Sequence, residues 1–392
     1  MKNIAILGST GSIGVSTIQV VEAAPEQFRV DLLVAGGNVA RLAEQIRRCR
    51  PRVAGLAQRE RLTALCAELG ISETARRFGD TQLISGNDEI LEAVRQSNAS
   101  IVVAAVVGMA GLGGVVAALE SGKDVALANK ESLVVAGSLI VEKARARGVR
   151  LIPVDSEHSA IFQALQGVPQ EDVQSVVLTA SGGPFLKTPI EQFSSITPEQ
   201  AVRHPKWNMG AKISVDSATL MNKALEVIEA RWLFDVEPDA IEVVVHPQSV
   251  IHSMVRLRDG GLLAQLSVPD MKGPIAYALT FPGPRLSGVI PRLDFAQLGQ
   301  LTFEDVDHVK FPSINRALAC LRGARGASAV LNAANEVAVA EFLNGKLAFS
   351  SIFNLVDRAL DQFGGNSYTT LDNLDELCTT VTEWARQIVR SE

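Results

Sequence analysis

Hydrophobic residues in the first 150 positions occur in short apolar runs, and segments with helical periodicity follow these runs. Two runs, Lys2–Leu7 and Phe28–Ala35, are each followed by glycines and then by an apolar-periodic helix pattern. Three further runs stand at Val53–Leu56, Ile101–Val107 and Asp124–Ala128. Strands that alternate with helices favour a parallel sheet with helices on both faces. We therefore predict a doubly wound, Rossmann-like α/β domain over residues 1–150.

The pattern after residue 150 predicts a second α/β domain over residues 151–281. Its strongest helix pattern, Ser217–Phe234, has two apolar stripes, with Asp216 or Ser217 as the N-cap. The dipeptide Asp259-Gly260 lies between two apolar runs and predicts a β-hairpin. The predicted strands are Leu151–Val154, Gln174–Ala180, Ile241–Val245, Val250–Leu257 and Leu262–Leu266.

The remainder of the chain is predicted to be a linker followed by helices. Pro282, Pro284 and Pro291 mark a loop-rich linker over residues 282–311. Four apolar-periodic segments then predict a C-terminal helical domain over residues 312–392, which we expect to brace the second domain. These segments are Ile314–Leu321, Ala327–Leu343, Ile352–Phe363 and Leu374–Val389.

Composition narrows the functional classes. The chain has 392 residues, of which 47% are hydrophobic and 20% charged, and a net charge of −6, as in ordinary soluble globular proteins. It has no long basic run, which argues against nucleic acid as a partner but leaves a phosphorylated small molecule possible. No apolar run is long enough to span a membrane. The four cysteines lack CxxC spacing and the N-terminus opens directly into a strand, so we expect a cytoplasmic protein with reduced thiols.

The first strand is followed by a glycine-rich turn, GSTGSIG, at residues 8–14. Thr10 replaces the second glycine of the usual dinucleotide fingerprint, but Gly8, Gly11 and Gly14 still allow a tight turn and a close approach to a pyrophosphate. The second strand ends in Gly36-Gly37-Asn38, where an adenosine ribose is normally recognised. A plain strand–helix turn is the alternative interpretation.

Asn129, Lys130 and Glu131 follow the strand predicted at 124–128, and parallel sheets place ligands at the carboxyl ends of their strands. The same residues also suit a capped helix start, with Asn129 as N-cap. Both interpretations are compatible.

Asp155, Ser156 and Glu157 end the next predicted strand. In an extended chain, Asp155 and Glu157 point to one side and Ser156 to the other. Two adjacent carboxylates favour a divalent cation between them, and their hard oxygen ligands suit magnesium or manganese. The alternative is a solvated acidic N-cap for a helix expected to take over at Ala160.

Two loops in the second domain have the chemistry of ligand-binding segments. Ser181 begins a Ser-Gly-Gly turn, whose hydroxyl and backbone N–H groups suit a phosphate. The segment HPKWNMG at 204–210 carries Trp207 and Met209 without any periodicity, as loops that close over ligands often do. A plain turn and a loop anchored on the core by Trp207 are the respective alternatives.

Polar residues interrupt the two apolar stripes of the predicted 217–234 helix. Asn222, Lys223 and Glu226 lie between the stripes and are expected to be buried, where polar groups need partners. They form either a structural ion pair or a metal-binding carboxylate beside phosphate-binding Asn and Lys side chains. His246 and His252 lie in apolar strands and are expected to be structural.

The motifs together closely resemble the 1-deoxy-D-xylulose-5-phosphate reductoisomerase family. They are GSTGSIG, LANKESLV, PVDSEHSAIFQ, SGGPF, HPKWNMG, ISVDSATLMNKALEVIEARWLF, HPQSVIHSMV and LNAANEVAVA. The resemblance covers nearly the whole chain and is weakest between Arg52 and Ser100 and after Phe349. It implies rearrangement of the substrate's carbon skeleton and reduction of the resulting aldehyde by NADPH to 2-C-methyl-D-erythritol 4-phosphate, in a homodimer that uses Mn²⁺, Mg²⁺ or Co²⁺.

The resemblance also implies a role for individual residues. Lys130 and the metal ligands would be catalytic, and the metal ligands are Asp155, Glu157 and Glu226. The substrate would contact Lys130, Ser156, Ser181, His204, Trp207, Met209, Ser217, Asn222, Lys223 and Glu226. The cofactor would contact Thr10, Gly11, Ser12, Ile13, Gly36, Gly37, Asn38, Asn129, Glu131 and Gly210.

The phosphate would be held by Ser181, Ser217, Asn222 and Lys223, with Trp207 and Met209 in a mobile flap. Gly37 departs from members that carry a basic residue there, and Arg41 or backbone N–H groups would compensate. The route, α-ketol shift or retro-aldol/aldol, is left open. A simple NAD(P)-dependent dehydrogenase and a non-catalytic dinucleotide sensor are the competing hypotheses.

Overall fold

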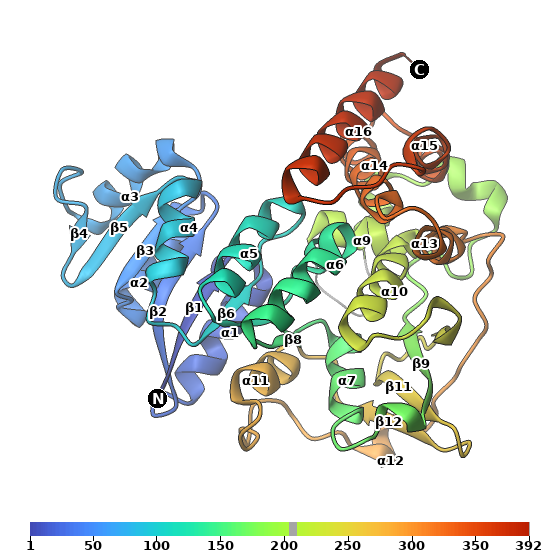
Figure 1. The fold of residues 1–392 in the computed structure, drawn as a ribbon, viewed down its shortest axis with the longest axis horizontal. Helices are drawn as coiled ribbons and strands as arrows, with labels where there is room; N and C mark the ends of the chain where they lie inside the picture. Colours follow the sequence, from blue (N-terminus) through green and yellow to red (C-terminus); the bar gives the residue numbers. More distant parts are fainter. Residues whose placement is uncertain (204–209, 392) are drawn as a thin grey trace. The chain divides into compact units, whose positions relative to one another are not determined.

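The computed structural model describes residues 1–203 and 210–391 (Figure 1). Its contacts divide the chain into two compact units, described separately below. Unit one comprises Met1–Ser132, Ile140–Ser159 and Asp270–Pro291; unit two comprises Leu133–Leu139, Ala160–Pro269 and Arg292–Glu392. The four-part domain division made from the sequence stays a prediction, because the two units interleave along the chain.

Unit one is built on an eight-stranded sheet with the order β4-β5-β3-β2-β1-β6-β7-β8. All neighbouring strands are parallel except the antiparallel pair β4–β5. The central strands are buried along most of their length, as expected for a sheet covered on both faces. The doubly wound prediction is confirmed. The strands are β1 (Lys2–Leu7), β2 (Phe28–Ala35), β3 (Val53–Leu56), β4 (Arg77–Phe78), β5 (Thr81–Ser85), β6 (Ile101–Ala104), β7 (Asp124–Leu127) and β8 (Leu151–Pro153).

Helices pack in pairs around this sheet, with α2 against α3, α4 against α5, and α1 against α11. Lys2 fastens α11 to the sheet, because its Nζ donates hydrogen bonds to the carbonyls of Leu279 (3.0 Å) and Phe281 (3.1 Å) at the helix end. The helices are α1 (Ser12–Ala23), α2 (Val39–Cys49), α3 (Leu62–Leu69), α4 (Asn87–Gln96), α5 (Leu112–Glu120), α6 (Lys130–Arg147) and α11 (Lys272–Thr280).

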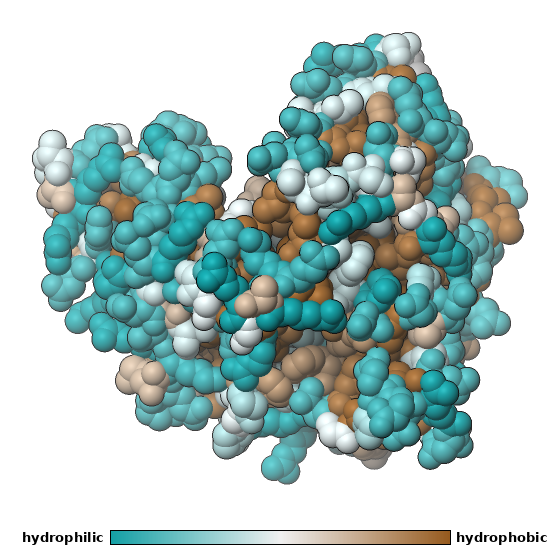
Figure 2. Space-filling model, viewed as in Figure 1, coloured by the Kyte–Doolittle hydropathy of each residue, from teal (hydrophilic) through white to brown (hydrophobic). Residues whose placement is uncertain are grey.

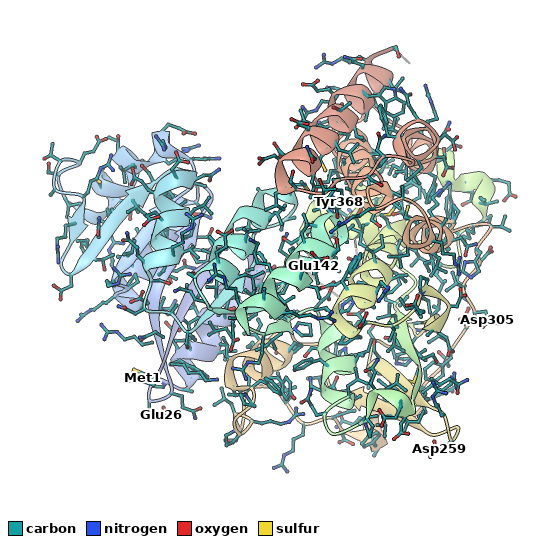
Figure 3. All side chains as sticks on the ribbon, in the orientation of Figure 1. Met1, Glu26, Glu142, Asp259, Asp305 and Tyr368 are labelled. Atoms are coloured by element: carbon teal, nitrogen blue, oxygen red, sulfur yellow. The ribbon has the colours of Figure 1, made fainter. Side chains whose placement is uncertain are left out.

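Helix α6 is kinked at Ala136, where φ is −128° and ψ is 21°. Within unit two, the Tyr368 hydroxyl donates to the Val135 carbonyl at 2.6 Å, just before the kink. Gly137 allows a close approach, because a Cβ there would lie 2.2 Å from the Trp232 ring. Tyr368 is labelled in Figure 3.

Unit two has a four-stranded sheet with the order β10-β9-β11-β12, where β10 (Ile241–Val245) pairs in parallel with β9 (Val173–Ala180). The antiparallel pair β11 (Ile251–Leu257) and β12 (Leu262–Leu266) confirms the predicted hairpin. Asp259, labelled in Figure 3, accepts a 2.8 Å hydrogen bond from Gly261 N in its turn.

Helices make up most of the rest of unit two, and α14 packs against both α15 and α16. Phe349 at the start of α15 lies at the centre of an aromatic cluster, with edge-on contacts to Phe185, Phe193 and Phe342. This cluster ties the segment after β9 to the C-terminal helices. The helices of unit two include α8 (Pro198–Ala201), α9 (Ala211–Ala218), α10 (Met221–Phe234), α12 (Phe295–Leu298), α13 (Ser313–Arg322), α14 (Ala327–Leu343), α15 (Phe349–Phe363) and α16 (Leu371–Ser391).

The single helix predicted over 217–234 is wrong, because the chain breaks between α9 and α10. Leu220 adopts a left-handed conformation with φ 53°. The Thr219 hydroxyl accepts a 3.3 Å hydrogen bond from Met221 N, which competes with helical pairing. Asp216 and Ser217 therefore lie in the last turn of α9 and do not cap α10. The apolar spacing runs unchanged through this break, so periodicity did not reveal it.

The polarity of the surface, the free cysteines and the helix lengths can be compared with what the composition predicted. Hydrophilic side chains dominate the visible face over the N-terminal strands and helices (Figure 2). The four cysteines are free thiols, and burial raises the pKa of Cys320 and Cys378 to about 12. Within residues 1–203 and 210–391, no helix combines the length and apolar character needed to cross a membrane.

Candidate functional site

The glycine turn after β1 has the backbone geometry that a pyrophosphate site needs. Gly8 has φ 86°, and a Cβ there would lie 2.4 Å from the Ala105 carbonyl oxygen. A Cβ on Gly14 would lie 2.3 Å from the Gly8 carbonyl oxygen, so helix α1 can approach the turn only because this residue is glycine. No side chain caps α1, whose first N–H groups lie at Ser12 and Ile13. The end of α1 is thus suited to an anion.

Helix α2, which follows the neighbouring strand β2, holds the glycine turn in place through side-chain hydrogen bonds. Gln45 Nε2 donates to the Ser9 carbonyl at 2.8 Å, and Arg41 Nη1 donates to the Thr10 carbonyl at 3.1 Å. Asn38 caps α2 by accepting from Arg41 N at 3.2 Å. The predicted cofactor residues 10–13 and 36–38 therefore follow the carboxyl ends of two adjacent parallel strands.

Asn129 follows β7 and forms several hydrogen bonds with residues around the end of this strand. Its Nδ2 donates to Glu131 at 2.9 Å and to the Gly108 carbonyl at 3.0 Å, and Ser132 donates to its Oδ1. Asn129 is the N-cap residue of α6 and Glu131 lies in its first turn, as predicted, but the Asn129 side chain makes no capping hydrogen bond to backbone. Its amide is used instead to fix the Glu131 carboxylate at the sheet edge.

Lys130 forms a close ion pair with Asp155, with 2.5 Å between Nζ and Oδ2. The Lys130 side chain is 8% exposed and that of Asp155 is 16% exposed. Their strands, β7 and β8, are parallel neighbours, which brings the two residues together from the same sheet edge. The Lys130 ammonium and the Asp155 carboxylate neutralise each other where little solvent reaches them.

The expected extended geometry at Asp155 to Glu157 is wrong. Helix α7 (Ser156–Ala164) begins here, and the Asp155 carbonyl already accepts a hydrogen bond from Ser159 N at 2.8 Å. Carboxylate oxygens of Asp155 and Glu157 nevertheless lie within 4.8 Å of each other. Ser156 Oγ donates to Glu157 at 2.5 Å, so the three residues form one polar cluster at the helix start.

His158 belongs to this cluster and was missed by the sequence interpretation. Its side chain is fully buried, and its Nδ1 lies 4.0 Å from the Asp155 carboxylate. The signal in the sequence was its i,i+3 spacing from Asp155, which became meaningful only once the helix start had moved to Ser156.

Helix α10 buries two of the three polar residues that the sequence placed between its apolar stripes, and Asn222 is partly buried. Lys223 is 3% exposed and Glu226 is 1% exposed, which confirms the expected burial. Lys223 and Glu226 form an ion pair, and Asn222 Nδ2 donates to Glu226 at 2.5 Å. Glu229, one turn along, is also buried, and its position was not anticipated.

The Ser-Gly-Gly turn after β9 meets the junction of α9 and α10. Gly182 and Gly183 adopt left-handed φ values of 85° and 67°. A Cβ on Gly183 would lie 2.6 Å from the Ser217 carbonyl oxygen. The turn carrying Ser181, the buried Ser217 and the first turn of α10 thus stand together within unit two. Hydroxyl and backbone N–H groups of the kind found here are donors that suit a phosphate.

Two further groups of polar residues serve the fold. His246 Nδ1 contacts the Thr302 carbonyl at 2.9 Å, and its Nε2 accepts from Val250 N and Ile251 N, so His246 is a satisfied core histidine as expected. Asn335 in α14 donates to Asp216 at 2.8 Å, which anchors α9 on the C-terminal helices.

Part of the predicted site lies outside the described residues. His204, Trp207 and Met209, and with them the proposed flap, fall within residues 204–209, which the structure does not describe. Gly210, predicted to contact the cofactor, stands just before α9 as its N-cap.

These arrangements define a dinucleotide-dependent oxidoreductase fold, joined to a unit with a glycine-rich turn and buried acidic residues. Family models then identify it more closely. The 1-deoxy-D-xylulose 5-phosphate reductoisomerase model matches residues 4–137, its C-terminal domain model matches 151–234, and a DXP reductoisomerase C-terminal domain model matches 266–388. The chain belongs to the 1-deoxy-D-xylulose 5-phosphate reductoisomerase family.

Curated relatives of that name match over nearly the full length. One from Prosthecochloris aestuarii is 50% identical and one from Geotalea daltonii is 47% identical, each over 99% of this chain and 98% of the relative. The Zymomonas mobilis reductoisomerase in complex with NADPH has a TM-score of 0.90 and 39% identity, over 99% of this chain and 98% of that chain. A DOX-P reductoisomerase in complex with NADPH, fosmidomycin and magnesium has a TM-score of 0.92 and 38% identity, over 100% and 98%.

Proposed function

We propose that the chain converts 1-deoxy-D-xylulose 5-phosphate to 2-C-methyl-D-erythritol 4-phosphate with NADPH and one divalent cation, as a step of non-mevalonate isoprenoid biosynthesis. The observation that carries this proposal is the match to relatives of that activity over 99% of the chain. Three of the motifs that carry the resemblance, GSTGSIG, LANKESLV and SGGPF, begin at or near the carboxyl ends of β1, β7 and β9. The reaction breaks one carbon–carbon bond and forms another, and then adds a hydride and a proton to the resulting aldehyde.

Asp155, Glu157 and Glu226 are the proposed cation ligands. Three carboxylates form a hard oxygen donor set that fits Mn²⁺, Mg²⁺ or Co²⁺. Asp155 and Glu226 each pair with a lysine, so a positive charge already balances each of them. When bound, the cation supplies charge stabilisation for substrate oxygens during the rearrangement.

The phosphate is assigned to Ser181, Ser217, Asn222 and Lys223. The contact between the Ser-Gly-Gly turn and Ser217, and the position of Asn222 and Lys223 in the first turn of α10, support this assignment. Held at that end, the substrate would extend along α10 towards Glu226. Binding energy gained from the non-reacting phosphate then positions the carbons that react.

Lys130 is assigned to the reacting part of the substrate together with Ser156. Its ammonium lies against Asp155, which orients it, and an ammonium group can donate hydrogen bonds to substrate oxygens. NADPH supplies the hydride when it binds at residues 10–13 and 36–38, with Asn129, Glu131 and Gly210 as further proposed contacts. His204, Trp207 and Met209 complete the proposed substrate contacts.

The test is NADPH oxidation with 1-deoxy-D-xylulose 5-phosphate before and after removal of divalent cations with EDTA. We expect turnover to disappear on chelation and to return with Mn²⁺, Mg²⁺ or Co²⁺. Undiminished turnover after complete chelation would favour a simple dehydrogenase. Cofactor binding without turnover in any metal would favour a non-catalytic dinucleotide sensor.

We also propose that the chain works as a cytoplasmic homodimer. Leu262 and Leu263 are 46% and 38% exposed on β12, the edge strand of the second sheet, and an exposed apolar edge strand favours pairing with another chain. Light scattering at micromolar concentration is expected to give twice the chain mass of 41.8 kDa. A monomeric mass would contradict the proposal. The four free cysteines, three of them buried, fit a reducing compartment.

A further inference from the structure

The end of β2 carries neither of the side chains that usually distinguish the two nicotinamide dinucleotides. Sites for NAD place an acidic residue there to bind the ribose hydroxyls, and sites for NADP place an arginine nearby to bind the 2′-phosphate. Here the sequence after Ala35 is Gly36-Gly37-Asn38, with no charge. The absence of an acid removes the feature that would repel a phosphate, but the positive charge has to come from elsewhere.

Gly37 has no side chain to supply this positive charge, and the space beside it is occupied by another residue. A Cβ on Gly37 would lie 2.1 Å from Gln58 Oε1, so the Gln58 amide fills the space beside the glycine. Gln58 N donates to the Gly36 carbonyl at 3.0 Å, which fixes the loop after β3 against the end of β2. A neutral amide side chain therefore stands where a basic residue at position 37 would begin.

Arg41 lies in the first turns of α2 and reaches back over the same edge. Its Nη1 donates to the Thr10 carbonyl at 3.1 Å, so the guanidinium lies between the glycine turn and the end of β2. Its side chain is exposed and forms no ion pair with any residue in 1–203 or 210–391. Three other arginines of this unit do pair with carboxylates: Arg48 with Glu22, Arg52 with Asp31, and Arg59 with Asp88.

We propose that Arg41 binds the 2′-phosphate of the adenosine ribose and is the residue that selects NADPH over NADH. This inference rests on the cofactor assignment in the proposed function. A guanidinium has five N–H donors in a planar fork, and the bond to Thr10 uses one of them. The remaining donors and the permanent charge suit a phosphate dianion. The hydrogen bond to Thr10 holds the side chain in place, which lowers the entropic cost of binding.

Calorimetric titration of the full chain with 2′,5′-ADP and with 5′-AMP tests this without any turnover. The native chain is expected to bind 2′,5′-ADP more tightly. Arg41→Ala is expected to lose about ten- to a hundredfold in affinity for 2′,5′-ADP, because a charged hydrogen bond to phosphate is lost. Affinity for 5′-AMP should not change, and this also shows that the site is folded. Arg29→Ala, an exposed arginine at the opposite end of β2, is the matched control and should bind both as the native chain does.

A rescue variant separates a direct contact from bracing of the glycine turn. Gly37→Lys in the Arg41→Ala background brings a cation from the end of β2, and the flexible Gln58 amide can rotate aside. It should restore the preference for 2′,5′-ADP, whereas a purely structural role of Arg41 would not be rescued.

Two results would overturn the inference. If Arg41→Ala kept the full preference, or if Arg59→Ala lost it instead, Arg41 would not be the selecting residue, although the NADPH assignment would stand. Equal binding of both nucleotides by the native chain would overturn the cofactor assignment as well.

Discussion

Glu226→Gln is expected to lower kcat by about a hundred- to a thousandfold or more, while NADPH still binds with native affinity. The change keeps the shape of the side chain but removes one of the three proposed anionic ligands of the cation. Charge that develops during the rearrangement is then poorly stabilised, and losing a single preorganised electrostatic contact costs about two to three orders of magnitude in kcat. The nucleotide residues of unit one are not touched, so fluorescence titration with NADPH should be unchanged.

The alternative is that Glu226 only neutralises Lys223 in the interior. Breaking a buried ion pair leaves an uncompensated charge and costs about 3–5 kcal/mol of stability. In that case the variant would melt at a lower temperature but retain its per-molecule kcat. Glu242→Gln is a control for the change from carboxylate to amide, since Glu242 forms a more exposed ion pair with Arg256 in the same unit, and the Arg256 hydrogen bond lowers its pKa. It should leave kcat unchanged. A folded Glu226→Gln protein with near-native kcat would end the metal-ligand assignment.

Lys223→Ala is expected to raise KM by about ten- to a hundredfold, with a smaller loss of kcat. A charged hydrogen bond to a phosphate contributes about 1.5–3 kcal/mol, which corresponds to that range. Because the phosphate is not part of the reacting centre, its loss acts first on binding and only then on positioning. Steady-state kinetics at saturating Mn²⁺ and NADPH would measure both constants.

The dephosphorylated sugar 1-deoxy-D-xylulose provides the control for this variant. It lacks the group that Lys223 is proposed to bind, so the native chain and Lys223→Ala should use it with similarly low kcat/KM. If the substitution lowered kcat/KM equally for the phosphorylated and dephosphorylated sugars, Lys223 would act through Glu226 and not through the phosphate.

Several strands could be predicted from the sequence where an apolar run marked their extent. β1, β2 and β3 begin and end where predicted, because most of their residues are apolar and buried. β12 also has the predicted bounds, although Leu262 and Leu263 are exposed. β4 and β5 were not predicted, because Arg77–Ser85 mixes charged, glycine and apolar positions without a clear period. β5 gains strand structure from pairing with β3, and β4 from pairing with β5, which sequence pattern alone does not reveal.

In the candidate site, too, some features could be predicted from the sequence pattern and others could not. Polar residues set in apolar stripes predicted the burial of Lys223 and Glu226, since the helix period fixes which side chains share a face. The helix start at Ser156 and the break at Leu220 depend on local hydrogen bonds of Asp155 and Thr219, which leave the apolar pattern unchanged. The Arg41 contact with Thr10 joins segments far apart in the chain and could not be predicted from spacing.

The most direct test of the proposed function is an NMR analysis of the product formed from 1-deoxy-D-xylulose 5-phosphate labelled with ¹³C, with NADPH oxidation recorded in the same sample. The proposed function predicts the branched product 2-C-methyl-D-erythritol 4-phosphate, with one NADPH oxidised per molecule formed. An unbranched polyol phosphate formed at the same stoichiometry would show reduction without rearrangement, and would contradict the assignment of a reductoisomerase in favour of a simple dehydrogenase.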